Sequence, residues 1–172
     1  RCQMINGLLG ASLPRDHAYG FIKLGRLVEC ADMTTRIMDV GAGDIMERAG
    51  RFGAIDPLLW GALLQALSAA AAYRREVGPI IEKDAALNFI FLNSTFPRSM
   101  KYFVRETRKE LMRLNNHDLT IRAVERLRRR LTRLDAEHFT TGELHDYIDD
   151  FQLQLTSLDA AIQATWFSWE NA

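Results

Sequence analysis

Four charged residues within the run 21–38 form the pattern best suited to chemistry in this chain. Arg26, Glu29, Asp32 and Arg36 follow one another at intervals of three and four residues. On an α-helix such residues lie on one side, so they predict a single charged stripe.

The residues around this stripe indicate where it lies. Most of the other side chains in the run are apolar and form broad arcs on both sides of the stripe, leaving only Lys23 and Thr34 as ordinary solvent positions. A helix that is apolar almost all round is usually buried. We therefore expect the stripe to be buried as well.

Buried charges must be paired or used, which gives two interpretations. In the first, Glu29 pairs with Arg26 and Asp32 with Arg36, one turn apart, and the ladder fixes the register of a bundle. In the second, Glu29 is a metal ligand or a general base and the arginines hold an anionic substrate. The first is the more common arrangement. Helical di-metal sites take Glu-x-x-His pairs from two helices, and the sequence has no such pair, so we predict no metal site.

Two further segments are candidates for binding. Arg98 and Ser99 follow a turn at the predicted start of a helix, where free backbone N–H groups can hold a carboxylate or phosphate. Tyr73, Arg74 and Arg75 end another predicted helix, where cations are favoured. A simple capped turn is the more common role for the first segment.

Basic residues are concentrated in one part of the chain. Residues 101–133 hold eleven of the 22 basic residues, whereas 134–172 hold none and carry eight acidic ones. We expect two successive helices to pair through complementary faces. The alternative is a ridge for phosphate or RNA, formed by Arg122, Arg126, Arg129 and Arg133. No aromatic or glycine-rich interleaving supports nucleic-acid binding, so the pairing is favoured.

Composition indicates a globular protein. The 172 residues carry 22 basic and 22 acidic side chains, which argues against a dedicated nucleic-acid or membrane-surface binder. There is no apolar run of about 20 residues and no signal-peptide pattern, so we expect no membrane contact and a cytoplasmic location. Cys2 and Cys30 lie far apart, as expected of free thiols in a reducing compartment.

The periodicity predicts an all-α fold, an antiparallel bundle of five to six helices in a single domain over 1–172. Asp16 is the expected cap of the long helix that carries the stripe, and the glycines from Gly41 to Gly53 predict a break after it, either a loop or a frayed short helix. Thr140 and Glu143 form a capping box before the last helix. A first helix is expected to end at about residue 11. The others are expected to cover about 16–40, 57–76, 82–92, 96–115, 118–136 and a stretch from 140 to near the end.

The motifs together resemble those of the bacterial Alpha-E family. The run Phe21-x-x-Leu24-Gly25-Arg26-x-x-Glu29-x-Ala31-Asp32-Met33-Thr34-x-Arg36-x-x-Asp39-Val40 is similar to the family signature. Three further motifs follow in the family's order: Trp60-x-x-Leu63-Leu64, Ala72-Tyr73-Arg74-Arg75 and Phe96-Pro97-Arg98-Ser99. One departure is Cys30, which stands where the family has an arginine after its glutamate.

The resemblance implies an uncharacterised all-helical domain whose prominent glutamate corresponds to Glu29. Members of the family are encoded with, or fused to, circularly permuted ATP-grasp proteins, which suggests peptide synthesis or modification by amide ligation. We therefore expect an accessory partner of an ATP-grasp-type ligase, with no cofactor of its own because ATP and Mg²⁺ belong to the ligase. The alternative is a catalytic domain with Glu29 as acid or base and with Arg26, Arg36 and Arg98 orienting the substrate. An RNA-binding bundle is the third hypothesis.

The resemblance also carries an expectation about length. The family's full domain is about twice as long, and this chain begins at Arg1 in helix-like sequence. We therefore expect the C-terminal half of a longer domain, whose absent half is either elsewhere in a longer polypeptide or replaced by a second copy in a homodimer.

Overall fold

The computed structural model describes residues 2–48, 55–135 and 139–168, and these ranges contain eight α-helices and no strand. The all-α fold class is confirmed, although the helices outnumber the five to six expected. In chain order they are α1 Cys2–Ser12, α2 His17–Glu47, α3 Asp56–Ala66, α4 Ala70–Glu76, α5 Lys83–Leu92, α6 Met100–Leu111, α7 Asp118–Thr132 and α8 Thr141–Trp166.

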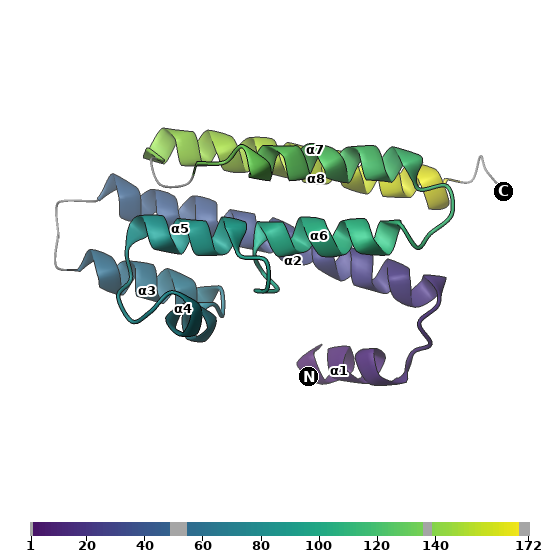
Figure 1. The fold of residues 1–172 in the computed structure, drawn as a ribbon, viewed down its shortest axis with the longest axis horizontal. Coiled ribbons are helices and arrows are strands. Elements are labelled where there is room, and N and C mark those ends of the chain that lie inside the picture. Colours follow the sequence, from purple (N-terminus) through teal and green to yellow (C-terminus); the bar gives the residue numbers. More distant parts are fainter. Residues whose placement is uncertain (1, 49–54, 136–138, 169–172) are drawn as a thin grey trace.

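Four long helices form the body of the molecule. α2 packs against α6 and α8, and α7 packs against α6 and α8, each neighbour running antiparallel to the next (Figure 1). α5 continues the line of α6, while α3 and α4 lie below the far end of α2 and α1 stands apart from the bundle (Figure 1). The expected antiparallel bundle is therefore present.

α2 is longer than the sequence suggested. Asp16 caps it as expected, its side chain accepting a hydrogen bond from the backbone N–H of Tyr19 at 3.1 Å. The helix then continues through Gly41 and Gly43 to Glu47, so the predicted break at these glycines is wrong. Burial of neighbouring apolar residues against α3 outweighs the low helix propensity of glycine. Gly50 and Gly53 lie outside the described residues.

The predicted helix over 57–76 is two helices. The chain turns at Ser68, whose φ of +56° is left-handed and interrupts the helix between α3 and α4. Leu67 and Ala69 on either side are fully buried, so the turn places both side chains in the core. α6 also begins later than expected, at Met100, whereas the capping box of Thr140 and Glu143 is confirmed.

The core is aromatic at its centre. Phe103 on α6 meets Phe151 on α8 at a ring separation of 6.5 Å, and Phe91 on α5 meets Tyr147 on α8 at 5.4 Å. Each such side chain stabilises the fold by about 1.5–3 kcal/mol through burial. Among the described residues, no helix combines the length and apolar character needed to cross a membrane.

Candidate functional site

The charged stripe of α2 faces solvent, so its predicted burial is wrong. Arg26, Glu29 and Arg36 are exposed, and Asp32 is half-buried. α2 turns its other arc to the core through Leu24, Leu27, Ala31 and Met38. A helical wheel shows that two arcs are apolar but not whether a neighbouring element covers both. Here only one arc is covered.

One of the two predicted ion pairs of the stripe is present. Arg36 Nε donates to Asp32 Oδ2 at 2.7 Å. This hydrogen bond and the charge of Asp32 raise the pKa of Arg36, and the charge of Glu29 adds to the effect. No hydrogen bond or ion pair joins Arg26 to Glu29 in the described part of the chain.

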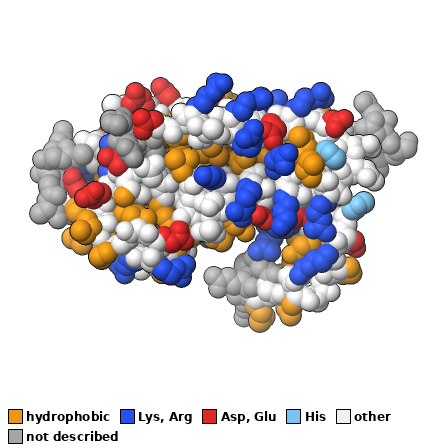
Figure 2. Space-filling view, in the orientation of Figure 1, with side chains coloured by type: hydrophobic (Ala, Val, Ile, Leu, Met, Phe, Trp, Pro, Cys, Tyr) orange, Lys and Arg blue, Asp and Glu red, His pale blue; other side chains and the backbone are white. Residues whose placement is uncertain are grey.

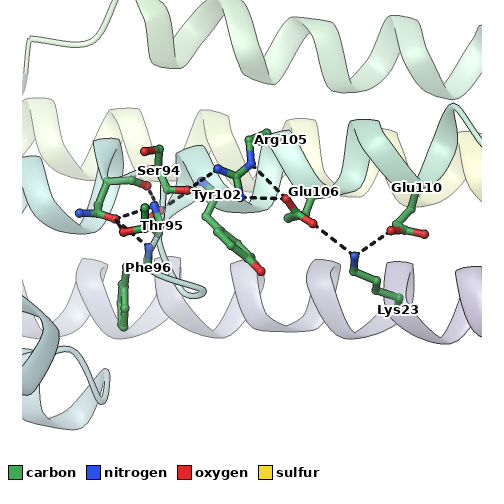
Figure 3. A network of polar contacts seen from close by, with 10 residues as sticks. Lys23, Ser94, Thr95, Phe96, Tyr102, Arg105, Glu106 and Glu110 are labelled. Atoms are coloured by element: carbon green, nitrogen blue, oxygen red, sulfur yellow. Dashed lines mark hydrogen bonds and ion pairs between the residues drawn. The ribbon is translucent and has the colours of Figure 1, made fainter. Parts of the chain in front are cut away.

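Lys23 and Thr34, expected at solvent positions, point inward instead. Thr34 is fully buried and donates to the carbonyl oxygen of Cys30 at 2.7 Å. Lys23 is half-buried, and its Nζ lies 2.7 Å from Glu110 and 3.2 Å from Glu106 on α6 (Figure 3). α2 therefore turns the charge of Lys23 toward α6, and not the charge of Glu29.

A chain of ion pairs extends from Lys23 along α6. Arg105 binds Glu106 Oε1 through Nε at 3.0 Å and Nη2 at 2.8 Å, and its Nη1 donates to the carbonyl of Ser94 at 2.6 Å (Figure 3). Burial opposes ionisation of Glu106, but the hydrogen bonds from Arg105 and Lys23 outweigh it and hold the pKa of Glu106 below its usual range. Arg113 completes the set with Glu110 at 3.4 Å. Because each carboxylate has its cations, the network ties α2 to α6 rather than forming an open site.

The turn over residues 93–99 is held by its own side chains. The side-chain oxygen of Asn93 accepts hydrogen bonds from the backbone N–H groups of Thr95 at 2.8 Å and Phe96 at 2.7 Å. Ser99 is fully buried; its hydroxyl donates to the Asn93 carbonyl and accepts from the N–H of Tyr102. Ser99 is therefore engaged as the cap of α6. Arg98 beside it is half-exposed and makes no hydrogen bond or ion pair with any described residue.

Tyr73 is a core residue. It is fully buried on α4, donates its hydroxyl hydrogen to the Ile80 carbonyl at 3.1 Å, and meets Phe89 edge-on at 5.5 Å. Burial raises the pKa of its phenol. Arg74, next in sequence, is exposed. Because Tyr73 and Ser99 have no exposed surface, they do not share one solvent-accessible pocket with the exposed Glu29.

The sequence did not predict a groove of about 760 Å³ between α6 and α7, here called the basic groove. Its floor is apolar, with Val104 and Leu131 buried in it, and five cations line it. These are Lys101, Arg105, Arg108, Lys109 and Arg128. Figure 2 shows the blue side chains gathered around an apolar centre on this face. The excess of basic residues over 101–133 was the sequence signal for it.

The chain matches the model of one protein family. The Alpha-E family, described as a predicted alpha-helical domain with a conserved ER motif, matches residues 1–167. Because the match covers nearly the whole chain, the expectation that the chain is only the C-terminal half of the domain is not borne out. No curated protein and no solved structure matches it.

Proposed function

Because this chain belongs to the Alpha-E family of helical domains, we propose that it is an accessory domain that binds an ATP-grasp-type amide ligase. The ligase brings ATP and Mg²⁺ and forms the peptide or amide bond in the cytoplasm. The helical domain binds the ligase and supplies no cofactor. The family resemblance supports this choice of partner, and the surface of α2 supports a binding role.

The main observation that supports the proposal is the exposed side of α2. We call this surface the signature face. It consists of Ile22, Gly25, Arg26, Glu29, Met33, Arg36 and Val40. Its apolar members are well exposed, Met33 at 44 % and Val40 at 74 %. At a rise of 1.5 Å per residue the face is about 27 Å long.

This mixture of side chains favours protein binding. Exposed apolar residues that lie in a continuous strip, with charges beside them, are typical of an interface. In the signature face, apolar side chains alternate with Arg26, Glu29 and Arg36 along one line. The apolar positions would supply buried area, and the charges would select the partner's orientation.

Solvent exposure of Glu29 argues against the catalytic alternative. A carboxylate that acts as acid or base is normally held in a water-excluding site, where its neighbours set its proton affinity. Glu29 lies on the open side of a helix. Exposure leaves the carboxylate free to contact a partner.

The test is whether the chain binds a purified ATP-grasp-type ligase. Met33→Asp places a charge in the signature face and should weaken the complex at least tenfold, as expected for an interface anchor. The matched control is Leu119→Asp on α7, because Leu119 is exposed to a similar extent, 46 %. Isothermal titration calorimetry measures both. Equal binding by the wild type and Met33→Asp would overturn the proposal, and so would dimerisation of the purified chain that Met33→Asp abolishes.

Glu29→Gln separates binding from catalysis. An accessory role predicts that the reconstituted pair still forms product at a rate within about twofold of the wild type, provided that the complex remains saturated. Loss of product formation with binding and helicity intact would show instead that Glu29 takes part in the reaction.

A further inference from the structure

The arginine ridge of α7 is largely unpaired. Arg122, Arg126, Arg129 and Arg133 are exposed, and none of their guanidinium groups makes a hydrogen bond or ion pair with a described residue. The expected pairing of α7 with the acidic α8 is found at Arg130, which binds Asp150. The positive charge of the ridge is therefore not neutralised by ion pairs with described residues and can attract an anion.

Three of these arginines line a cavity beside α8. It has a volume of about 510 Å³, within the range typical of small-molecule sites. The cavity is lined by Arg126, Arg129, Arg130, Arg133, Leu134, Asp135, Phe139, Tyr147 and Gln154. Arg122, one turn before Arg126, is outside that lining. Arg130 is paired with Asp150, so the lining carries three unpaired arginines beside one aspartate and is positive.

Two residues of α8 bring unsatisfied polar atoms to the cavity lining. The hydroxyl of Tyr147 and Oε1 of Gln154 are buried and make no hydrogen bond within the described residues. Tyr147 is only 8 % exposed, so its hydroxyl has lost water without gaining a partner. A buried polar group in this state destabilises the fold unless a bound molecule supplies its partner. Nε of Arg130 is also buried and unpaired.

These atoms have complementary requirements. The Tyr147 hydroxyl and Arg130 Nε are donors that need acceptor oxygens, whereas Oε1 of Gln154 is an acceptor that needs a hydroxyl group. A phosphate ester with a free hydroxyl supplies both, and its negative charge matches the three unpaired arginines.

The acidic residues of α8 lie beside a different hollow. Glu143, Asp146, Asp149 and Asp150 line it together with Arg130 and Tyr147, so these two side chains border both hollows. An anion is repelled from the acidic hollow and attracted to the arginine side.

We propose that the cavity between α7 and α8 binds a small phosphate ester that carries a hydroxyl group. Arg126, Arg129 and Arg133 hold the phosphate, and Tyr147 and Gln154 bind its oxygens and hydroxyl. This site is separate from the signature face and does not depend on the proposed function.

An RNA backbone offers the same phosphate chemistry but fits less well. Bound single strands usually stack bases on free aromatic faces. The two rings in the lining are engaged: Phe139 and Tyr147 are 5.5 Å apart, and Arg130 lies over the Tyr147 ring at 4.4 Å.

Calorimetric titration with ribose 5-phosphate tests the proposal, with uncharged ribose as the ligand control. We expect ribose 5-phosphate to bind and ribose not to bind. The double variant Arg126→Gln/Arg129→Gln should weaken binding at least tenfold. Arg122→Gln is the control for each single arginine of that pair, since it also removes one positive charge from α7 but outside the cavity, and it should change affinity less than twofold.

Tyr147→Phe removes only the unpaired hydroxyl and should weaken ribose 5-phosphate binding about fivefold while leaving the fold intact by circular dichroism. Absence of ribose 5-phosphate binding would overturn the proposal, as would equal losses in Arg122→Gln and in Arg126→Gln alone. A ten-nucleotide RNA that binds when ribose 5-phosphate does not would assign the arginine ridge to RNA instead.

Discussion

Nζ of Lys23 on α2 lies 2.7 Å from Oε1 of Glu110 on α6, and the Glu110 side chain is only 3 % exposed. The same nitrogen binds Glu106 at 3.2 Å. One lysine therefore serves two carboxylates that have lost most of their water. Since α2 and α6 are adjacent long helices of the bundle, this contact joins the two across the sequence.

Lys23→Met should destabilise the fold. The methionine keeps most of the packing of the lysine stem but leaves Glu106 and Glu110 without their shared cation. Removing one partner of a fully buried pair costs about 3–5 kcal/mol, and partial exposure of Lys23 reduces the expected loss to about 2 kcal/mol. Urea denaturation followed by circular dichroism measures it.

Lys101→Met is the control for that measurement. Lys101 is exposed on α6 and makes no ion pair with a described residue, so this change should alter the free energy of unfolding by less than about 0.5 kcal/mol. Adding Glu106→Gln and Glu110→Gln to Lys23→Met should restore part of the lost stability. Equal effects of the two lysine variants would show that Lys23 contributes nothing by its charge.

The same network predicts how stability depends on pH. The pKa of Glu106 is held below its usual range, so its contribution is present above the unfolded-state pKa of about 4.3 and is lost as the pH falls through the folded-state value. Burial lowers the pKa of Lys23, but Glu110 and Glu106 outweigh burial and raise it. The lysine contribution is therefore complete below a pH of about 10.4 and is lost above the raised value.

The free energy of unfolding, measured by chemical denaturation across this pH range, should have a plateau. It should fall along an acid limb below the plateau and an alkaline limb above it. Glu106→Gln should flatten the acid limb, because the titrating carboxylate is gone, while leaving the alkaline limb in place. An acid limb of unchanged steepness in Glu106→Gln would assign it to other carboxylates.

Periodicity was enough to predict the helical fold but not the orientation of α2. Two arcs of α2 are apolar, and the covered one had to be chosen by the packing of α6 and α8. Because α2 turns Leu24 and Ala31 inward, Lys23 and Thr34 follow them, and Glu29 moves to the surface. Neighbours distant in sequence decided this, and the wheel contains no information about them.

Local signals were reliable where a side chain bonds to nearby backbone. The caps at Asp16 and Thr140 were predicted because their hydrogen bonds span three residues. Ser68 was missed because no local residue preference marks a left-handed serine, and burial of Leu67 and Ala69 fixes it. The cavity between α7 and α8 depends on Tyr147 and Gln154 facing arginines from another helix, which charge counting does not show.

Two glycines of α2 should respond differently to alanine. A Cβ at Gly43 meets nothing within 4 Å, so Gly43→Ala should gain the helix propensity of alanine, about 1 kcal/mol. A Cβ at Gly41 would lie 2.6 Å from Cδ1 of Leu63, which is on α3 and is buried. Gly41→Ala should therefore be less stable than Gly43→Ala by at least about 1 kcal/mol. Thermal unfolding of the two variants compares them. Equal stabilisation would show that Leu63 moves aside without cost.

His145 on α8 should be a titrating link to α2. Its Nδ1 lies 2.7 Å from Oδ1 of Asp39, and its Nε2 lies 3.5 Å from Asp149. The hydrogen bond with Asp39 is the main cause of its raised pKa, followed by the charges of Asp39 and Asp149. The link is therefore complete below the unfolded-state value of about 6.5 and is lost as the pH rises through the raised value.

NMR titration of the imidazole protons tests this order of causes. Asp39→Asn should lower the pKa of His145 more than Asp149→Asn does, because only Asp39 makes the hydrogen bond at 2.7 Å. The two variants remove the same charge, so any difference between them reports geometry. A larger drop in Asp149→Asn would mean that His145 pairs within α8 in solution and does not hold α2.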